Sequence, residues 1–117
     1  MELPVLRDVL AARPHVYARM SRSPLLGHPL LTSWVGADVW VKHENHNPTG
    51  AFKIRGGLNL VPQLGEQERR RGVVSASTGN HGQSIALASQ LHGVRCRIVV
   101  PVGSNPEKIA AMRAYGA

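Results

Sequence analysis

Apolar and polar positions in the second half of this chain follow two different periods. Short apolar runs over residues 72–77 and 95–101 have the length and the β-branched content of buried strands. Residues 83–93 and 104–117 instead repeat apolar positions every three or four residues, as amphipathic helices do. Asn105 and Pro106 are typical of a helix start. We therefore expect strand, helix, strand and helix in this order.

The first 36 residues are interrupted by prolines and glycine. Residues 6–20 carry apolar positions at helical spacing around Pro14, which predicts one or two short helical pieces. Residues 21–36 contain Pro24, Gly27 and Pro29, so we expect them to be extended or turning.

The middle of the chain combines an alternating segment with a helical one. Residues 39–43 alternate and are rich in β-formers, which favours a strand, and residues 45–50 form a polar loop. Residues 52–64 have helical spacing, although Gly56 and Gly57 weaken this prediction.

The alternation of strands and helices from residue 39 onward predicts the α/β class. We expect an open parallel sheet with flanking helices and right-handed crossovers. Ligands bind such sheets beyond the carboxyl ends of the strands. Two unusual loops, over residues 44–51 and 77–82, follow predicted strands at that edge. The pattern therefore predicts a ligand site where these loops meet.

Composition narrows the class of protein. The chain has 117 residues, of which 43% are hydrophobic, enough for one globular domain. No apolar run reaches the ~20 residues of a membrane span, and the N-terminus lacks the layout of a secretory signal. We therefore expect a cytoplasmic protein with no membrane partner. The single cysteine, Cys96, excludes an internal disulfide and a cysteine-built metal site.

The formal charge of +7 raises the possibility of a nucleic-acid partner. The arginines are scattered, apart from a run over residues 68–72, and aromatic residues make up 4% of the chain, so stacking platforms are scarce. We expect no nucleic-acid partner. A non-catalytic basic α/β binding module stays open as the alternative class.

A metal site is not predicted either. His43 and His46 stand three residues apart in HENH, whereas the zinc-protease signature places two histidines four apart on a helix. Asn45, Asn47 and Pro48 make a helix here improbable.

Lys53 is the residue that most needs an explanation. It stands at the start of a predicted helix, where the positive end of the helix dipole makes a cation structurally unfavourable. Partial burial at that position would favour the neutral amine that Schiff-base chemistry requires. The second loop, residues 77–82, offers hydroxyls, backbone N–H groups and a carboxamide, which suit a carboxylate. An amine beside a carboxylate-binding turn indicates amino-acid chemistry.

Three segments carry a family resemblance: KHENHNPTGAFKIRGG (42–57), SASTGNHGQSIALA (75–88) and VVPVGSNPEKIAAMRAYGA (99–117). They closely resemble pyridoxal-phosphate enzymes of the tryptophan-synthase-β type (fold type II), and among these the threonine/serine dehydratases and serine racemases. The resemblance implies that Lys53 binds pyridoxal 5'-phosphate as a Schiff base, with Phe52 beside the ring and Asn80 hydrogen-bonded to its phenolic oxygen. It assigns the substrate carboxylate to Ser77, Thr78, Gly79, Asn80 and His81.

The resemblance also implies a reaction, β-elimination from L-threonine or L-serine. Lys53 would remove the α-proton, the β-hydroxyl would leave, and hydrolysis would give ammonia and a 2-oxo acid. His81 favours dehydratases and racemases over threonine synthases, which stay an alternative. Racemases of this kind have a serine where Thr78 stands. Thr78 keeps the hydroxyl but adds a methyl group, so serine racemase stays an alternative that is not favoured.

Members of this family are considerably longer, two-domain chains. We therefore expect an N-terminal fragment: residues 1–38 as a segment that packs partly on a missing large domain, and residues 39–117 as most of the small domain. No glycine-rich run that could hold the cofactor phosphate occurs here, so we expect the isolated polypeptide to be inactive. The resemblance also implies that the full-length parent is a homo-oligomer. Several apolar side chains should then be exposed: Val5, Leu6, Leu25, Leu26 and Leu30.

Overall fold

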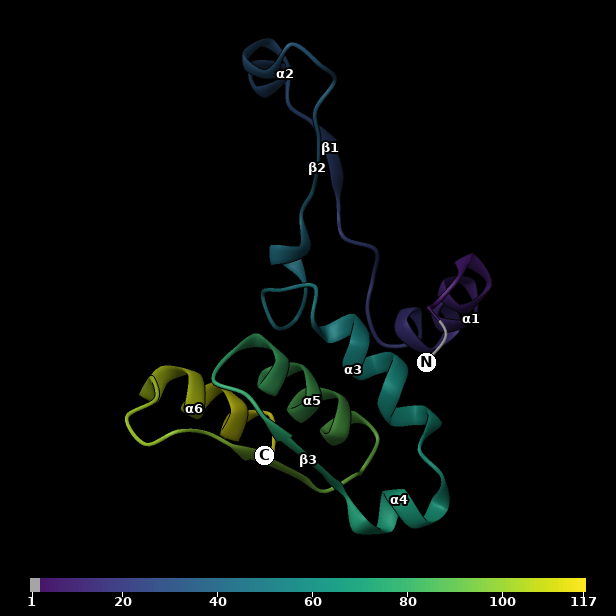
Figure 1. Cartoon of the computed structure of the whole chain (residues 1–117), viewed down its shortest axis with the longest axis vertical. Helices are drawn as coiled ribbons and strands as arrows, with labels where there is room; N and C mark the ends of the chain where they lie inside the picture. Colours follow the sequence, from purple (N-terminus) through teal and green to yellow (C-terminus); the bar gives the residue numbers. More distant parts are fainter. Residues whose placement is uncertain (1–2) are drawn as a thin grey trace.

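A computed structural model describes residues 3–117 and shows an elongated molecule (Figure 1). Its principal extents are 52 × 38 × 28 Å. An N-terminal helix and a projecting two-stranded ribbon precede a body of helices and a small parallel sheet (Figure 1). No helix in this described part is long and apolar enough to cross a membrane.

The N-terminal segment contains one helix, α1 (Leu6–Tyr17), as predicted for this region. The helix continues through Pro14. Its start is stabilised because the carboxylate of Asp8 accepts a hydrogen bond from the backbone N–H of Val5 at 2.8 Å. Val16 is the buried residue of α1.

The ribbon consists of β1 (Leu25–Gly27), α2 (Pro29–Val35) and β2 (Trp40–Lys42). The strands are antiparallel, with Leu25 opposite Lys42. The prediction that residues 21–36 are only extended or turning was wrong, because Pro29 occupies the first position of α2, where a proline favours a helix. The strand predicted over residues 39–43 exists, but it pairs with β1 and does not join a parallel sheet.

The body confirms the α/β class. A 3-10 turn, η1 (Glu44–His46), leads to α3 (Ile54–Leu60) and η2 (Val61–Gln63), which together match the helix predicted over residues 52–64. Strands β3 (Val73–Ala76) and β4 (Cys96–Val99) pair in parallel through the crossover helix α5 (Asn80–Leu91), and α6 (Pro106–Ala114) follows. Asn105 caps α6 as predicted, since its Oδ1 accepts from the N–H of Glu107 at 2.8 Å.

The start of α5 and the presence of α4 differ from the sequence expectation. Helix α5 begins at Asn80 and not at residue 83, so the turn between β3 and α5 is shorter than expected. Helix α4 (Glu66–Arg71) was not predicted. Its start is marked by Glu68, whose carboxylate accepts from the N–H of Gly65 at 2.7 Å, and this spacing is a readable helix-start signal.

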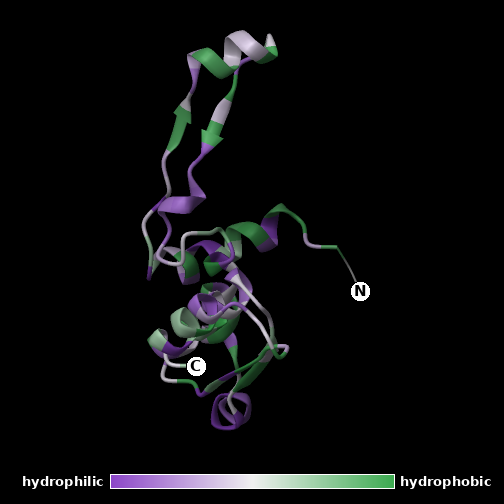
Figure 2. Cartoon of the chain, turned by 90° about the vertical axis from the view of Figure 1, so that its left-hand side faces the viewer, coloured by the Kyte–Doolittle hydropathy of each residue, from purple (hydrophilic) through white to green (hydrophobic). Residues whose placement is uncertain are grey.

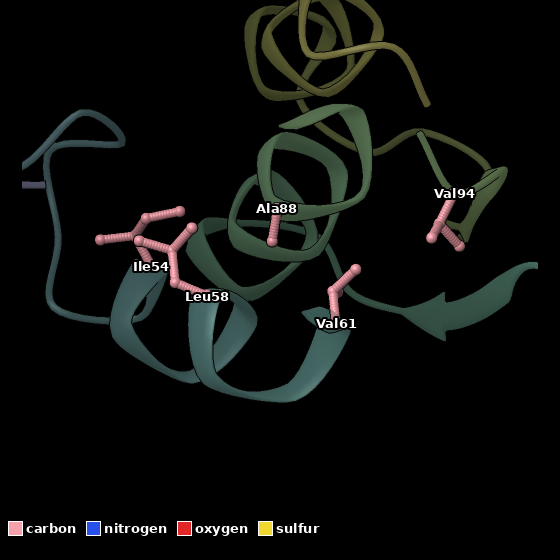
Figure 3. Close-up of a cluster of buried hydrophobic side chains, with 5 residues drawn as sticks. All are labelled: Ile54, Leu58, Val61, Ala88 and Val94. Atoms are coloured by element: carbon pink, nitrogen blue, oxygen red, sulfur yellow. The ribbon is translucent and has the colours of Figure 1, made fainter. Parts of the chain in front are cut away.

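The core lies between α3 and α5. Figure 3 shows its buried apolar side chains, Ile54, Leu58, Val61, Ala88 and Val94. A Cβ added to Gly57 would lie 2.6 Å from the carbonyl oxygen of Ser84 and 2.7 Å from its Oγ. The two helices therefore approach as closely as they do because residue 57 has no side chain.

Much apolar surface lies outside this core. Green, hydrophobic segments are visible along the projecting ribbon in Figure 2. Leu30 is 75% exposed and Trp34 is 81% exposed. The exposure predicted for the N-terminal segment is confirmed for all five residues: Val5, Leu6, Leu25, Leu26 and Leu30.

Candidate functional site

Lys53 is the N-cap of α3 and follows a tight turn. Gly50 adopts a positive φ of 64° in that turn, which favours glycine, and its N–H donates to the carbonyl of Asn47 at 2.8 Å. The side chains of Lys53 and Phe52 are both exposed, and the lysine Nζ lies 5.0 Å from the centre of the phenyl ring. The described residues therefore do not bury Lys53, and the partial burial considered from sequence is not found.

A partly buried hydrogen bond joins the backbone of Lys53 to α5. The hydroxyl of Ser84, which is fully buried, donates to the carbonyl oxygen of Lys53 at 2.6 Å. Asn80 precedes Ser84 by four residues, and residues four apart lie one above the other on a helix. Asn80 therefore lies on the α3-facing side of α5, one turn nearer its N-terminus. The hydrogen bond therefore sets the backbone of Lys53 against α5, the helix that begins at Asn80.

The loop between β3 and α5 is shaped by Ser77. Its Oγ accepts hydrogen bonds from the N–H groups of Gly79 at 3.3 Å and Gly82 at 2.9 Å. The N–H of Ser77 donates to the carbonyl oxygen of Val99 at 3.1 Å, and this hydrogen bond fixes the loop at the carboxyl end of the sheet. The hydroxyl oxygen of Ser77 is thus engaged within the turn.

The other polar groups of the loop face outward. Thr78, Asn80 and His81 are exposed, and the last two begin α5. The first N–H groups of an α-helix lack intrahelical acceptors, and the dipole adds partial positive charge there. A carboxylate placed at this helix start would accept hydrogen bonds from the backbone.

The structure also places an ion pair beside Lys53 that the sequence did not predict. The Nε of Arg55 lies 2.8 Å from Oε2 of Glu44, and its Nη2 lies 2.8 Å from Oε1. Glu44 also accepts from Ser23 Oγ and from Asn47 Nδ2, each at 2.6 Å. Both carboxylate oxygens are therefore fully used. From sequence, the only signal was a charge two residues after the lysine.

This network shifts the acidity of Glu44. Hydrogen bonding from Arg55, supported by Ser23 and Asn47, outweighs burial and lowers the pKa of Glu44 from 4.5 to about 2. The same pair raises the pKa of Arg55. Because Arg55 also donates to the hydroxyl of Tyr17 at 3.3 Å, the network ties α1 to the segment that carries Lys53.

A second contact supports the turn before Lys53 from the opposite side. The hydroxyl of Tyr115, just after α6, donates to the carbonyl of Pro48 at 3.0 Å. Asn47 Nδ2 donates to the carbonyl of Ala51 at 3.3 Å and closes the turn. The turn is therefore anchored on both flanks, and the exposed side chains of Phe52 and Lys53 start from a fixed backbone.

Residues 3–117 contain no group of three or more His, Cys, Asp or Glu side chains that could hold a metal ion. His43 and His46 belong to the loop around η1 and not to an α-helix, so the zinc-protease arrangement is not formed. The chemistry available at the site is that of an amine, an aromatic ring, a carboxamide and a helix N-terminus.

A profile of the pyridoxal-phosphate dependent enzyme family matches residues 17–117. An L-threo-3-hydroxyaspartate ammonia-lyase of Saccharomyces cerevisiae is 38% identical over 117 residues, which are 100% of this chain and 36% of that protein. A serine racemase of Schizosaccharomyces pombe is 37% identical, over 97% of this chain and 35% of that protein. An L-threonine ammonia-lyase of Thermotoga maritima is 40% identical, over 96% of this chain and 28% of that protein.

Solved structures share the fold. The serine racemase of Dictyostelium discoideum superposes with a TM-score of 0.92 at 35% identity, over 97% of this chain and 37% of that chain. The processed form of threonine deaminase isoform 2 from Solanum lycopersicum gives a TM-score of 0.83 at 31% identity, over 97% of this chain and 33% of that chain. The chain spans about a third of the length of the relatives it matches.

Proposed function

The chain belongs to the pyridoxal-phosphate dependent enzyme family, and on that premise we propose that it supplies the catalytic lysine of an ammonia-lyase acting on β-hydroxy amino acids such as L-threonine and L-serine. The products would be ammonia and a 2-oxo acid. The observation that carries the proposal is the hydrogen bond from Ser84 Oγ to the Lys53 carbonyl. It holds the backbone of Lys53 against α5, and the first residues of that helix belong to the turn for which we propose carboxylate binding.

The residues at this site fit the cofactor of the family. Lys53 provides the primary amine that binds an aldehyde covalently, and Phe52 exposes an aromatic ring next to it. Asn80 provides a carboxamide that hydrogen-bonds a phenolic oxygen. When bound, pyridoxal phosphate supplies an electron sink for the bonds at the α-carbon of an amino acid.

Each residue of the site has a distinct task in this proposal. Thr78, Asn80 and His81 hold the substrate carboxylate at the start of α5, while Ser77 and Gly79 set the path of the turn. The Nζ of Lys53 takes the proton from the α-carbon. Fixing the carboxylate orients the bond to that proton, which is where positioning contributes most to the rate.

Racemisation is the second candidate function. The exposed Thr78 keeps a hydroxyl in the carboxylate turn, and a serine racemase is among the similar proteins. Elimination is favoured because Thr78 carries an added methyl group where a racemase of this kind has serine, and because several similar proteins are ammonia-lyases.

Covalent trapping tests the role of Lys53 sharply, because the chain has only three lysines: Lys42, Lys53 and Lys108. The chain is mixed with substoichiometric pyridoxal phosphate, reduced with borohydride, digested and mapped by mass spectrometry. In the wild type we expect the label on Lys53. The Lys108→Gln variant should be labelled as the wild type is, and the Lys53→Arg variant should carry no label. A label spread over all three lysines would instead support a generic basic surface and refute the proposal.

We expect these 117 residues alone to bind the cofactor without sustained turnover, since no glycine-rich run for its phosphate occurs among them. The assay is 2-oxo-acid release from L-threonine and L-serine by the purified chain. Steady release of a 2-oxo acid would show that this expectation is wrong. The role of Lys53 is tested separately, by the trapping experiment.

A further inference from the structure

Two histidines outside the lysine site face each other along the β1–β2 ribbon. His28 directly follows β1, and His43 directly follows β2. Their Nε2 atoms are 3.3 Å apart, and their ring centres are 5.5 Å apart at an angle of 44°. Both side chains are half-buried. The chemistry proposed for Lys53 makes no use of either ring.

The backbone holds both histidines in place. The N–H of His28 donates to the carbonyl oxygen of Val39 at 3.2 Å, and the N–H of His43 donates to that of Pro24 at 2.9 Å. Each histidine therefore continues the strand pairing at one end of the ribbon. Counting outward from the pair Leu26 and Val41, both positions fall on the same face of the ribbon. The rings therefore meet across one face from two fixed points of the backbone.

Their separation matches that of two ligands on one metal ion. Zinc–nitrogen bonds of about 2.0–2.1 Å at a tetrahedral angle place two nitrogens about 3.3–3.4 Å apart. An N–H···N hydrogen bond, with one Nε2 donating and the other accepting, also fits this distance. The spacing accommodates a shared ion, and the titration described below distinguishes it from a shared proton.

We propose that His28 and His43 form a two-histidine clamp for a divalent transition-metal ion such as Zn²⁺. Imidazole nitrogen is a preferred ligand for this group of metals. Binding requires a lone pair on both Nε2 atoms, so each ring carries its proton on Nδ1 in the bound state. Water fills the remaining coordination positions, because the described residues bring no third metal-binding side chain to the pair.

The neighbouring polar groups are engaged elsewhere or point aside. Glu44, the residue after His43, is bound to Arg55. The ring of His46 stands edge-on to that of His43, with 5.7 Å between the ring centres. The clamp therefore consists of the pair alone, and it joins the far end of the ribbon to the loop that leads toward Lys53.

Isothermal titration of the 117-residue chain with zinc chloride tests the clamp. We expect one Zn²⁺ per chain, with affinity reduced at least tenfold in His28→Gln and in His43→Gln. Glutamine keeps a polar group of similar reach, and circular dichroism checks that each variant folds. His15→Gln, on α1, is the matched control and should bind zinc as the wild type does. Zinc should also raise the melting temperature of the wild type and of this control only.

Equal zinc affinity in the wild type and His28→Gln would overturn the proposal. It would also be overturned if His46→Ala lowered the zinc affinity as much as His43→Gln does. A readout that needs no variant is electron paramagnetic resonance of the wild type with one equivalent of Cu²⁺. Coupling to two imidazole nitrogens supports the clamp, and coupling to one or none contradicts it.

Discussion

At the scale of single residues, the position of Lys53 depends on a hydroxyl that contacts its backbone carbonyl. Ser84 is fully buried, and its Oγ donates to the Lys53 carbonyl at 2.6 Å. Sequence reasoning selected Lys53 and Asn80, but it gave Ser84 no role, because a serine within an apolar helix has no distinctive pattern. The contact that holds the backbone of Lys53 against α5 is therefore visible only in three dimensions.

Replacing Ser84 with alanine should weaken the fold by about 1 kcal/mol, because the carbonyl oxygen of Lys53 loses the hydrogen bond from the Ser84 hydroxyl and keeps the one from the N–H of Gly56 at 3.1 Å. Urea unfolding measures this change. Ser33→Ala, at an exposed position of α2, is the control and should change the free energy of unfolding by less than about 0.5 kcal/mol. Equal stability of the Ser84 variant and the wild type would show that this hydrogen bond does not hold the loop.

At the scale of elements, the crossing of α3 and α5 sets the geometry of the site. Gly57→Ala should cost about 1–3 kcal/mol, because the new Cβ would lie 2.6 Å from the carbonyl oxygen of Ser84 and push the helices apart. Labelling of Lys53 by pyridoxal phosphate should also be lower in Gly57→Ala than in the wild type.

Gly56→Ala is the matched control for this substitution. It lies on the same helix but faces open space, so it should be neutral or stabilising by up to about 1 kcal/mol. Both variants are compared by thermal unfolding and by the trapping assay. If the two behaved alike, close helix approach would not govern the site.

The ion pair between Glu44 and Arg55 predicts a pH dependence. The pKa of Glu44 is lowered to about 2 in the folded chain, so its stabilising contribution is present above about 4.5 and is lost as the pH falls through about 2. After allowance for partial solvent screening, we expect Glu44→Gln to cost roughly 2 kcal/mol at neutral pH and little near pH 2.

Urea unfolding of the wild type and Glu44→Gln at a series of pH values measures this difference. Glu66→Gln, which removes the exposed pair with Arg70, is the control and should show almost no change. A cost for Glu44→Gln that stays constant from neutral pH to pH 2 would contradict the lowered pKa.

The sequence was most informative where local signals act alone. Residues such as Asn105 and Pro106 marked the start of α6 correctly, because capping depends on neighbours in the chain. The partner of β2 could not be predicted, since strand pairing depends on contacts distant in sequence, and β1 has only three residues. The Glu44–Arg55 pair escaped prediction for the same reason, as eleven residues separate its members.

At the scale of the whole molecule, the exposed apolar residues of the N-terminal segment and ribbon need a covering surface. The chain spans about a third of the relatives it matches, and we propose that the corresponding remainder of such a protein packs on this surface. The division into residues 1–38 and 39–117 stays a prediction. The cofactor phosphate would also be held by that remainder, whereas the lysine and the carboxylate turn lie within the described residues.

We propose that Lys53 and the turn at the start of α5 hold one and the same molecule. It is tested most directly by amide proton–nitrogen spectra of the nitrogen-labelled chain during titration with N-phosphopyridoxyl-L-serine, a stable compound that joins cofactor and substrate. We expect the largest shifts to fall on Phe52, Lys53 and residues 78–82 together. Shifts confined to the arginines of α4, or to only one of the two segments, would contradict it.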